Sequence, residues 1–179
     1  MDIEASLTTS ASVEAVLAHV DDLAAYPKWM SLVHSATRVA DAPESTWNVE
    51  LRASVGPFAR SKRLRLVRTA YDHGDATLGA AHGGDVRRIV FERRETDGRT
   101  HAMWRLTVVV TGGGVNAGTV PTVPTVPTLP TVPTAATGGG TNLVMQLHYD
   151  GRFFVGVVES ILQQHIDAGR KRLSELLAG

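Results

Sequence analysis

The sequence predicts an α+β fold in which one antiparallel sheet curves around a long C-terminal helix. Two patterns predict it. Most of the chain consists of short segments in which apolar and polar residues alternate, the period of a strand with one buried face. The last segment, residues 153–177, instead has apolar residues at helical spacing. With 179 residues, the chain is expected to form a single domain, residues 1–179.

The N-terminal part predicts one strand followed by two short helices. In residues 1–9 apolar side chains occupy alternate positions, which indicates a half-buried strand. Ser10 or Ser12 can cap a helix whose apolar residues, within 13–20, have helical spacing. Two aspartates then precede a second short helix, which is expected over residues 23–25.

The rest of the chain predicts further strands before the long helix. Two tight turns help to define them: Gly56-Pro57 in a first hairpin, and Asp97-Gly98, a strong hairpin signal, in a second. Five strands in meander order are expected at residues 35–40, 46–55, 58–69, 88–95 and 101–111, and a last strand at 142–149. Consecutive strands joined in this way pair antiparallel.

A proline-rich segment interrupts the last pair of strands. Residues 112–140 contain five consecutive Thr-Val-Pro or Thr-Leu-Pro triplets, which begin at Thr119 and end at Pro133 between two glycine triplets. Proline at every third position favours an extended, polyproline-II-like chain. Because the strand and helix that follow are too small to form a core alone, the segment is expected to be an exposed, low-complexity loop insertion within one domain. The alternative is a ligand for a polyproline-reading protein.

Composition excludes several classes of function. The 18 basic residues balance the 18 acidic ones, and the basic strands at 58–69 and 88–95 are expected to be solvated faces, so nucleic acid is not an expected partner. The chain has no cysteine, its histidines lack metal-ligand spacing, and Thr-Val-Pro triplets follow its Gly112-x-Gly114-x-x-Ala117 pattern where a dinucleotide site needs a helix, so neither a metal nor a cofactor is expected. The absence of a targeting peptide and of a long apolar segment predicts a cytoplasmic protein without stable membrane insertion.

Large side chains on the predicted inner face, with two polar ones, are the candidate ligand-binding residues. Arg93 shares the parity of Phe91 and should point toward the apolar face, where an unpaired charge commonly marks a ligand. Periodicity leaves open whether this face fills a core or lines a pocket. The candidates are Trp29, Trp47, Val49, Leu51, Leu64, Leu66, Phe91, Arg93, Trp104, Leu106, Met145, Leu147, Phe154, Val158, Leu162 and His165.

Several strings resemble the START-like, polyketide cyclase and birch-pollen-allergen (SRPBCC) superfamily. "DLAAYPKWMSLV" resembles its Tyr/Trp-Pro-x-Trp segment after the first helix. "VGPFARSKRLRLVRT", "RRIVFERRETDGRTHAMWRL" and "TNLVMQLHYDGRFFVGVVESIL" resemble its middle strands, late hairpin and final strand-to-helix junction. The resemblance covers nearly the whole chain outside residues 72–85 and the insertion. It implies a helix-grip fold, with a seven-stranded antiparallel sheet around the C-terminal helix and a cavity between them.

Three functions follow as hypotheses. The resemblance implies binding of a hydrophobic small molecule such as a lipid, isoprenoid or polyketide, with transport of that molecule as an option and with Arg93 or His165 as a polar contact. The second hypothesis is a polyketide cyclase or dehydratase whose cavity side chains exchange protons with the substrate, although no set of catalytic residues carries over from the family. The third is an interaction module that uses the polyproline-like loop.

Overall fold

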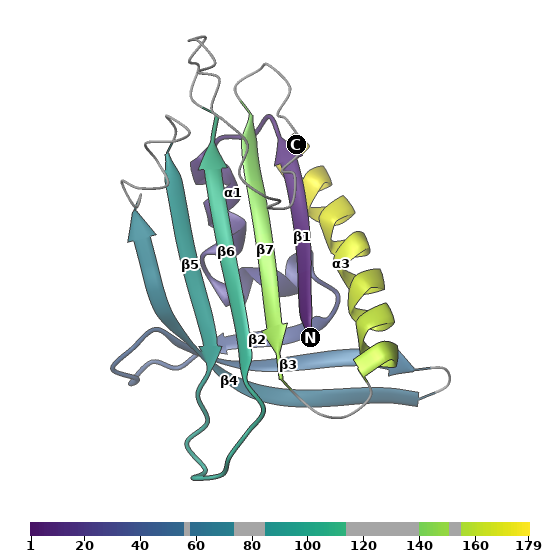
Figure 1. Cartoon of the computed structure of the whole chain (residues 1–179). Helices are drawn as coiled ribbons and strands as arrows, with labels where there is room; N and C mark the ends of the chain where they lie inside the picture. The colour runs from purple at the N-terminus through teal and green to yellow at the C-terminus, as the bar shows by residue number, and fades with distance from the viewer. Residues whose placement is uncertain (56–57, 74–84, 114–139, 151–154) are drawn as a thin grey trace, which may run out of the picture.

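The computed structural model describes residues 1–55, 58–73, 85–113, 140–150 and 155–179. Figure 1 shows the elements that these ranges form. In chain order they are β1 (Asp2–Thr9), α1 (Val13–Val20), the 3₁₀ helix η1 (Leu23–Lys28), β2 (Val33–Arg38), β3 (Thr46–Val55), β4 (Phe58–His73), β5 (Val86–Arg93), β6 (Trp104–Gly112), β7 (Thr141–Tyr149) and α3 (Val155–Ala178).

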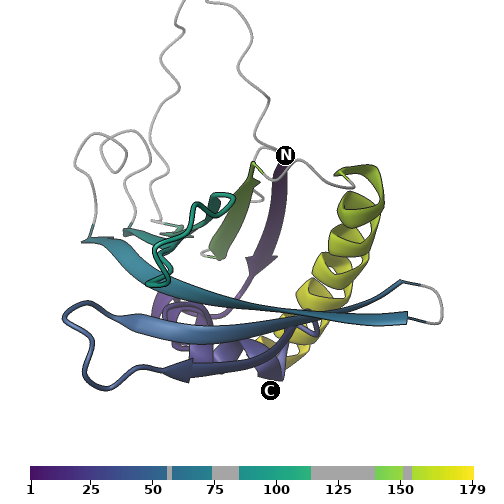
Figure 2. The same cartoon turned by 90° about the horizontal axis from the view of Figure 1, so that it is seen from below.

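The strands form one seven-stranded sheet in the order β1-β7-β6-β5-β4-β3-β2, and every neighbouring pair is antiparallel. From β2 to β7 each strand lies beside the next one in the chain, while β1 closes the sheet as the edge strand beyond β7. The sheet curves around α3, which runs beside β1 (Figures 1 and 2). This arrangement confirms the predicted α+β helix-grip fold.

Side-chain caps define the two short helices after β1. The predicted cap at Ser12 is confirmed, since its hydroxyl oxygen accepts a hydrogen bond from the Ala15 amide at 3.2 Å. Asp22 caps η1 by accepting from the Ala24 amide at 2.8 Å, and the same oxygen accepts from Trp47 Nε1 at 2.7 Å. One carboxylate therefore both starts η1 and ties it to β3. The second helix extends beyond the predicted 23–25, because its 3₁₀ form continues through the proline.

The hairpin between β5 and β6 differs from the predicted one. The sequence predicts strands over 88–95 and 101–111, but the structure has a longer connection over 94–103. Gly98 has a positive φ of 70°, as the Asp-Gly signal predicts. Asp97 accepts a hydrogen bond from the Arg99 amide at 3.1 Å and pairs with His101 Nε2 at 2.8 Å. These side-chain bonds replace ladder pairing at this end of the hairpin.

The core lies between the concave face of the sheet, the short helices and α3. Trp47 on β3 packs edge-on against Phe91 on β5, with ring centroids 5.5 Å apart. Two buried aromatic residues of the η1 region donate hydrogen bonds to backbone carbonyls of α1. The Tyr26 hydroxyl donates to the Val20 carbonyl at 3.0 Å, and Trp29 Nε1 donates to the His19 carbonyl at 3.1 Å. The most fully buried side chains are Trp29, Trp47, Tyr26, Phe91, Ile89, Leu173, Val16, Val20, Val108, Val110 and Thr46.

The strands on either side of the proline-rich insertion pair directly with each other. Gly112 at the end of β6 lies opposite Thr141 at the start of β7. The Gly113 amide donates to the Gly140 carbonyl at 2.9 Å, which continues the ladder by one step. The Thr-Val-Pro triplets lie outside the described residues. Among the described helices, none combines the length and the apolar character that crossing a membrane requires.

Candidate functional site

A cavity of about 100 Å³ lies between the concave face of the sheet, η1 and α3. Most of its lining is aliphatic or aromatic, and Arg170 is the single charged residue among the described residues that line it. These are Ile3, Ala5, Ser6, Leu7, Leu23, Tyr26, Trp29, Met30, Leu32, Val33, Val49, Leu51, Leu66, Trp104, Leu106, Leu143, Met145, Leu147, Leu162, Ile166, Arg170 and Leu173. The period-2 pattern of the strands and the helical stripe of α3 bring these side chains to one interior.

The described residues that line the cavity include Ser6 on β1 and Arg170 on α3. Ser6 is an exposed residue of β1, and the side chain of Arg170 on α3 is 49% exposed. Arg170 Nη1 lies 3.8 Å from Asp167 Oδ1, one turn earlier on the same helix. The cavity therefore meets solvent where β1 and α3 run side by side, and a cationic group stands at that boundary.

Nine of the predicted ligand-binding residues line this cavity: Trp29, Val49, Leu51, Leu66, Trp104, Leu106, Met145, Leu147 and Leu162. Trp47, Leu64 and Phe91 share the inner face but are buried in the core outside that lining. Phe154 lies outside the described residues, and so does the side chain of Val158. The alternation of side chains along a strand identifies the inner face of the sheet. It does not distinguish inner-face residues that pack against each other from those that face the cavity.

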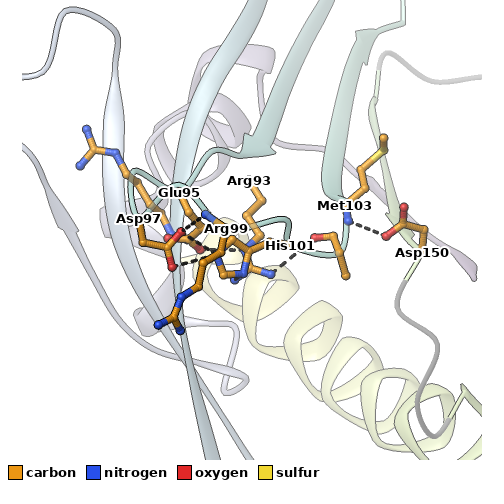
Figure 3. Close-up of polar contacts among 9 residues, drawn as sticks. Arg93, Glu95, Asp97, Arg99, His101, Met103 and Asp150 are labelled. Atoms are coloured by element: carbon orange, nitrogen blue, oxygen red, sulfur yellow. Dashed lines mark hydrogen bonds and ion pairs between the residues drawn. The ribbon is translucent and has the colours of Figure 1, made fainter.

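Arg93 points inward, as parity predicts, and its side chain is 8% exposed, but it does not line the cavity. Its Nε donates to Glu95 Oε1 at 2.7 Å, and its Nη1 donates to the Ala102 carbonyl at 3.5 Å (Figure 3). Its Nη2 lies 3.1 Å from His101 Nδ1. Because a guanidinium only donates, His101 Nδ1 accepts, and its Nε2 carries the proton toward Asp97. The charge of Arg93 is thus balanced within the β5–β6 hairpin.

Lys62, Tyr149 and Trp104 lie between the charged residues of the β5–β6 hairpin and the cavity wall. Lys62 Nζ lies 5.3 Å from the centroid of the Tyr149 ring, and that ring packs edge-on against Trp104 at 5.6 Å. Partial burial lowers the pKa of Lys62, and the positive charge of Arg93 lowers it further. The hydrogen bond to His101 holds the pKa of Asp97 below its ordinary value. These charges stabilise one end of the sheet behind the cavity wall.

His165 faces a second, polar groove of about 410 Å³ on the other flank of α3. Its Nδ1 lies 2.8 Å from Ser31 Oγ, in the segment before β2, and partial burial lowers its pKa. At about 100° per residue, His165 and Arg170 are about 140° apart around the helix. Other described residues that line the groove are His34, Arg52, Gln164 and Ala168.

Arg63, Arg94 and Arg105 lie on the outer face of the sheet beside acidic partners. Arg63 Nε is 3.5 Å from Glu50 Oε2, and Arg105 Nε is 2.7 Å from Glu92 Oε1. Arg94 Nη2 lies 3.6 Å from the other oxygen of Glu92. Exposed pairs of this kind contribute little stability, but they break up the positive charge of this face.

Sequence reasoning missed two groups of lining residues. Residues of β1, such as Ile3 and Ala5, carry the same period-2 signal as the other strands, so parity could have included them. The η1 region contributes Leu23, Tyr26 and Met30, and a short irregular helix has no periodicity that assigns such residues to a cavity. The position of Arg170 follows only from how α3 is rotated against β1.

Comparisons with known proteins support the helix-grip fold described above. The sequence matches the family described as "Polyketide cyclase / dehydrase and lipid transport" over residues 9–177. No curated protein sequence matches the chain. Among solved structures, a START superfamily protein from Mycobacterium smegmatis is similar with a TM-score of 0.54 at 15% identity, covering 99% of this chain and 97% of that one.

Two further solved structures with this fold are a lipid transfer protein and a di-domain ARO/CYC protein. Human StAR-related lipid transfer protein 5 has a TM-score of 0.60 at 11% identity, over 99% of this chain and 75% of that one. The di-domain ARO/CYC BexL from the BE-7585A biosynthetic pathway has a TM-score of 0.52 at 12% identity, over 100% of this chain and 50% of that one. The fold is therefore START-like, and the chain belongs to the polyketide cyclase/dehydrase and lipid transport family.

Proposed function

We propose that the protein binds a hydrophobic or amphipathic small molecule, such as a lipid, isoprenoid or polyketide, in the cavity between the sheet and α3. The observation that carries the proposal is the chemistry of the lining, in which one charged residue at the rim accompanies an otherwise apolar wall. Family membership supports the same class of ligand. Transport would follow if the ligand is released to a membrane or to another protein.

The polar atoms of two lining aromatic residues, Tyr26 and Trp29, are already bound to the protein. The Tyr26 hydroxyl and Trp29 Nε1 donate to backbone carbonyls of α1, so these two rings offer apolar surface to the cavity. Burial of an alkyl chain against such a wall is worth about 0.8 kcal/mol per CH₂ before the costs of binding. An apolar ligand therefore gains affinity mainly by leaving water.

The enzymatic alternative, a polyketide cyclase or dehydratase, needs groups in the cavity that exchange protons with the substrate. Within the described part of the lining there is no carboxyl group and no imidazole. Arg93 and His101 are engaged with each other, and His165 faces the polar groove. We therefore propose binding in preference to catalysis. Arg93 and His165 become positioning residues of the walls in this proposal, in place of the direct ligand contacts that the sequence suggested.

The remaining expectations concern partners and location. The paired charges on the outer face support the view that nucleic acid is not a partner. Recognition of the segment from Thr119 to Pro133 by a polyproline-reading protein stays a prediction, which capture by an isolated SH3 domain would support. The cytoplasmic location also stays a prediction, to be checked by cell fractionation.

The direct test is to identify and replace the ligand. Protein purified without detergent should yield a stoichiometric apolar compound when it is extracted with organic solvent and analysed by mass spectrometry. The extracted protein should bind 1-octanol, a neutral probe, with a change in the fluorescence of Trp29 and Trp104, which line the cavity. No extractable ligand together with no octanol binding would contradict the proposal.

A cavity-filling substitution and a matched control locate the binding. Ala5 on β1 lines the cavity, so Ala5→Phe should weaken octanol binding at least about ten-fold by occupying the space. Thr8→Phe adds the same ring at an exposed position of the same strand and should leave binding unchanged. Both affinities are measured by calorimetry, with thermal unfolding as a check on folding. Equal binding by Ala5→Phe and the wild type would place the ligand elsewhere.

A further inference from the structure

We infer that the ligand is a single-chain amphiphile with an anionic headgroup, which Arg170 binds at the seam between β1 and α3. This inference rests on the proposed function and adds to it the class of ligand, the route of entry and a specificity-determining residue. The term β1–α3 seam is used here for the part of the cavity lining where Ser6 on β1 and Arg170 on α3 lie.

The first argument is the position of the charge. Arg170 is the single charged group of the described lining, and its half-exposed side chain stands at the boundary between the cavity and water. A carboxylate or phosphate can meet it there while keeping part of its hydration, whereas the tail enters the apolar interior. An anion placed deeper would lose its hydration against apolar walls, at a cost of several kcal/mol.

The second argument is that Arg170 is weakly engaged within the chain. Its partner among the described residues is Asp167, at 3.8 Å, whereas charge-assisted hydrogen bonds are typically about 2.7–2.9 Å long. A guanidinium offers five N–H donors in a planar fork, which matches the two oxygens of a carboxylate. An incoming headgroup can therefore make better hydrogen bonds than Asp167 makes now.

The third argument is that α3 is hydrogen-bonded to its neighbours on one side and not on the other, among the described residues. On the β2 flank, His165 and Ser31 are hydrogen-bonded at 2.8 Å, and Gly169 packs so closely that a Cβ there would lie 3.2 Å from Met30 Cε. On the β1 flank, the described residues include no hydrogen bond or ion pair between β1 and α3. Among the described residues, β1 and α3 are therefore held together by packing, without a polar bond that would have to break, and we take the β1–α3 seam as the route of entry.

The edge position of β1 adds polar groups to the same seam. β1 pairs only with β7, so part of its backbone N–H and C=O groups point away from the sheet, toward α3. These N–H groups are further donors for an anionic headgroup. The seam thus combines a cation and free backbone donors beside an apolar interior.

The small volume of the cavity favours one chain over two. At about 100 Å³ it is smaller than the roughly 300–1,000 Å³ of pockets that enclose drug-sized ligands. A single alkyl chain that enters from the seam needs less volume than two acyl chains or a broad ring system. The inferred ligand is therefore a fatty-acid-like anion or a single-chain phosphate ester.

The test compares matched ligands on the whole protein. Octanoate and 1-octanol share a chain length and differ in charge, and octyl phosphate distinguishes a phosphate from a carboxylate headgroup. By calorimetry at low salt, octanoate should bind about five-fold more tightly than octanol, the size of effect expected for one half-exposed ion pair. Octyltrimethylammonium should bind more weakly than octanol, and dioctanoyl phosphatidic acid more weakly than octyl phosphate.

Variants of α3 assign the preference to one residue. Arg170→Gln should bring the octanoate-to-octanol affinity ratio to about one and leave octanol binding unchanged, whereas Arg170→Lys should retain most of the ratio. Asp167→Asn removes the competing carboxylate and should raise the ratio. Lys171→Gln is the matched control, because it removes the same charge from the next position, which is exposed, and should change nothing.

The outcomes separate the two proposals. If octanol fails to bind, the proposed function fails and the inference fails with it. If octanol binds but octanoate binds no better, or if Lys171→Gln lowers the ratio as much as Arg170→Gln does, the inference alone is overturned. Tighter binding of the two-chain lipid would overturn the assignment of a single chain.

Discussion

At the scale of single residues, His165 shows how burial and hydrogen bonding set the state of a titratable group. Partial desolvation lowers its pKa, so the neutral ring is favoured in the folded protein. Ser31 is hydrogen-bonded to it, and His34 and Arg52 line the same groove. A proton on His165 would therefore place a second positive charge in the groove that Arg52 also lines.

This arrangement predicts that stability decreases in mild acid. Because the folded-state pKa of His165 lies below the ordinary value of 6.5, the unfolded chain binds more protons between the two values, and the free energy of unfolding falls as pH decreases through that window. Urea unfolding of the wild type and of His165→Gln between pH 7.5 and pH 5 measures the effect. The stability of the wild type relative to the variant should decline on acidification. A difference that is constant with pH would contradict the prediction.

At the scale of elements, the packing of α1 on the end of β6 depends on the absence of one side chain. Gly112 ends β6, and a Cβ at this position would lie 2.8 Å from Val13 Cγ2 in the first turn of α1. The same glycine donates its amide to the Asp85 carbonyl at 2.8 Å. Val13 is buried and β-branched, so its methyl group has little freedom to move away.

Alanine substitutions at two glycines should therefore differ in effect. Gly112→Ala should lower the free energy of unfolding by about 1–3 kcal/mol through overpacking against Val13. Gly169→Ala meets the flexible end of Met30 at 3.2 Å, and the gain in helix propensity, about 1 kcal/mol, offsets much of the strain. Chemical denaturation compares the two. In the Gly112→Ala background, Val13→Ala should cost less than it does alone, and strict additivity would argue against a direct clash.

At the scale of the whole molecule, β6 and β7 pair up to the border of the proline-rich insertion. Gly112 lies opposite Thr141, and Gly113 is hydrogen-bonded to Gly140 at 2.9 Å. The ends of the insertion thus lie at the distance that a two-residue hairpin loop spans. The cavity lies toward α3 and η1, and its described lining includes no residue between 112 and 142.

A shortened chain should therefore fold and bind as the full chain does. Replacement of residues 114–139 by Asn-Gly supplies a turn that suits the twist of the hairpin. Because loop closure becomes less costly, the free energy of unfolding should stay the same or rise by about 1–2 kcal/mol. Thermal unfolding and octanol binding are measured on both chains. A lower melting temperature or lost binding would show that the insertion contributes to the domain.

Much of the architecture could be predicted because the strands are half-buried and their periodicity is strong. The β3 and β4 patterns place Val49 and Leu64 on the inner face, as observed. The connection between β5 and β6 was predicted too short, because the hydrogen bonds that Asp97 makes with the Arg99 amide and with His101 depend on side-chain geometry. Strand alternation also predicted that Arg93 points inward. It could not show that Arg93 Nε pairs with Glu95 Oε1 at 2.7 Å.

The sequence by itself determined the strands, their antiparallel order, the long helix and the face that each of them buries, because these depend on local periodicity and on short connections. Only the tertiary structure decided which inner-face residues pack into the core, as Trp47 and Phe91 do, and which line free space, as Leu51 and Trp104 do. It also decided that Arg170 stands at the cavity rim. The physical reason is that these placements depend on the curvature of the sheet and on the rotation of α3 against it, and no local pattern encodes either.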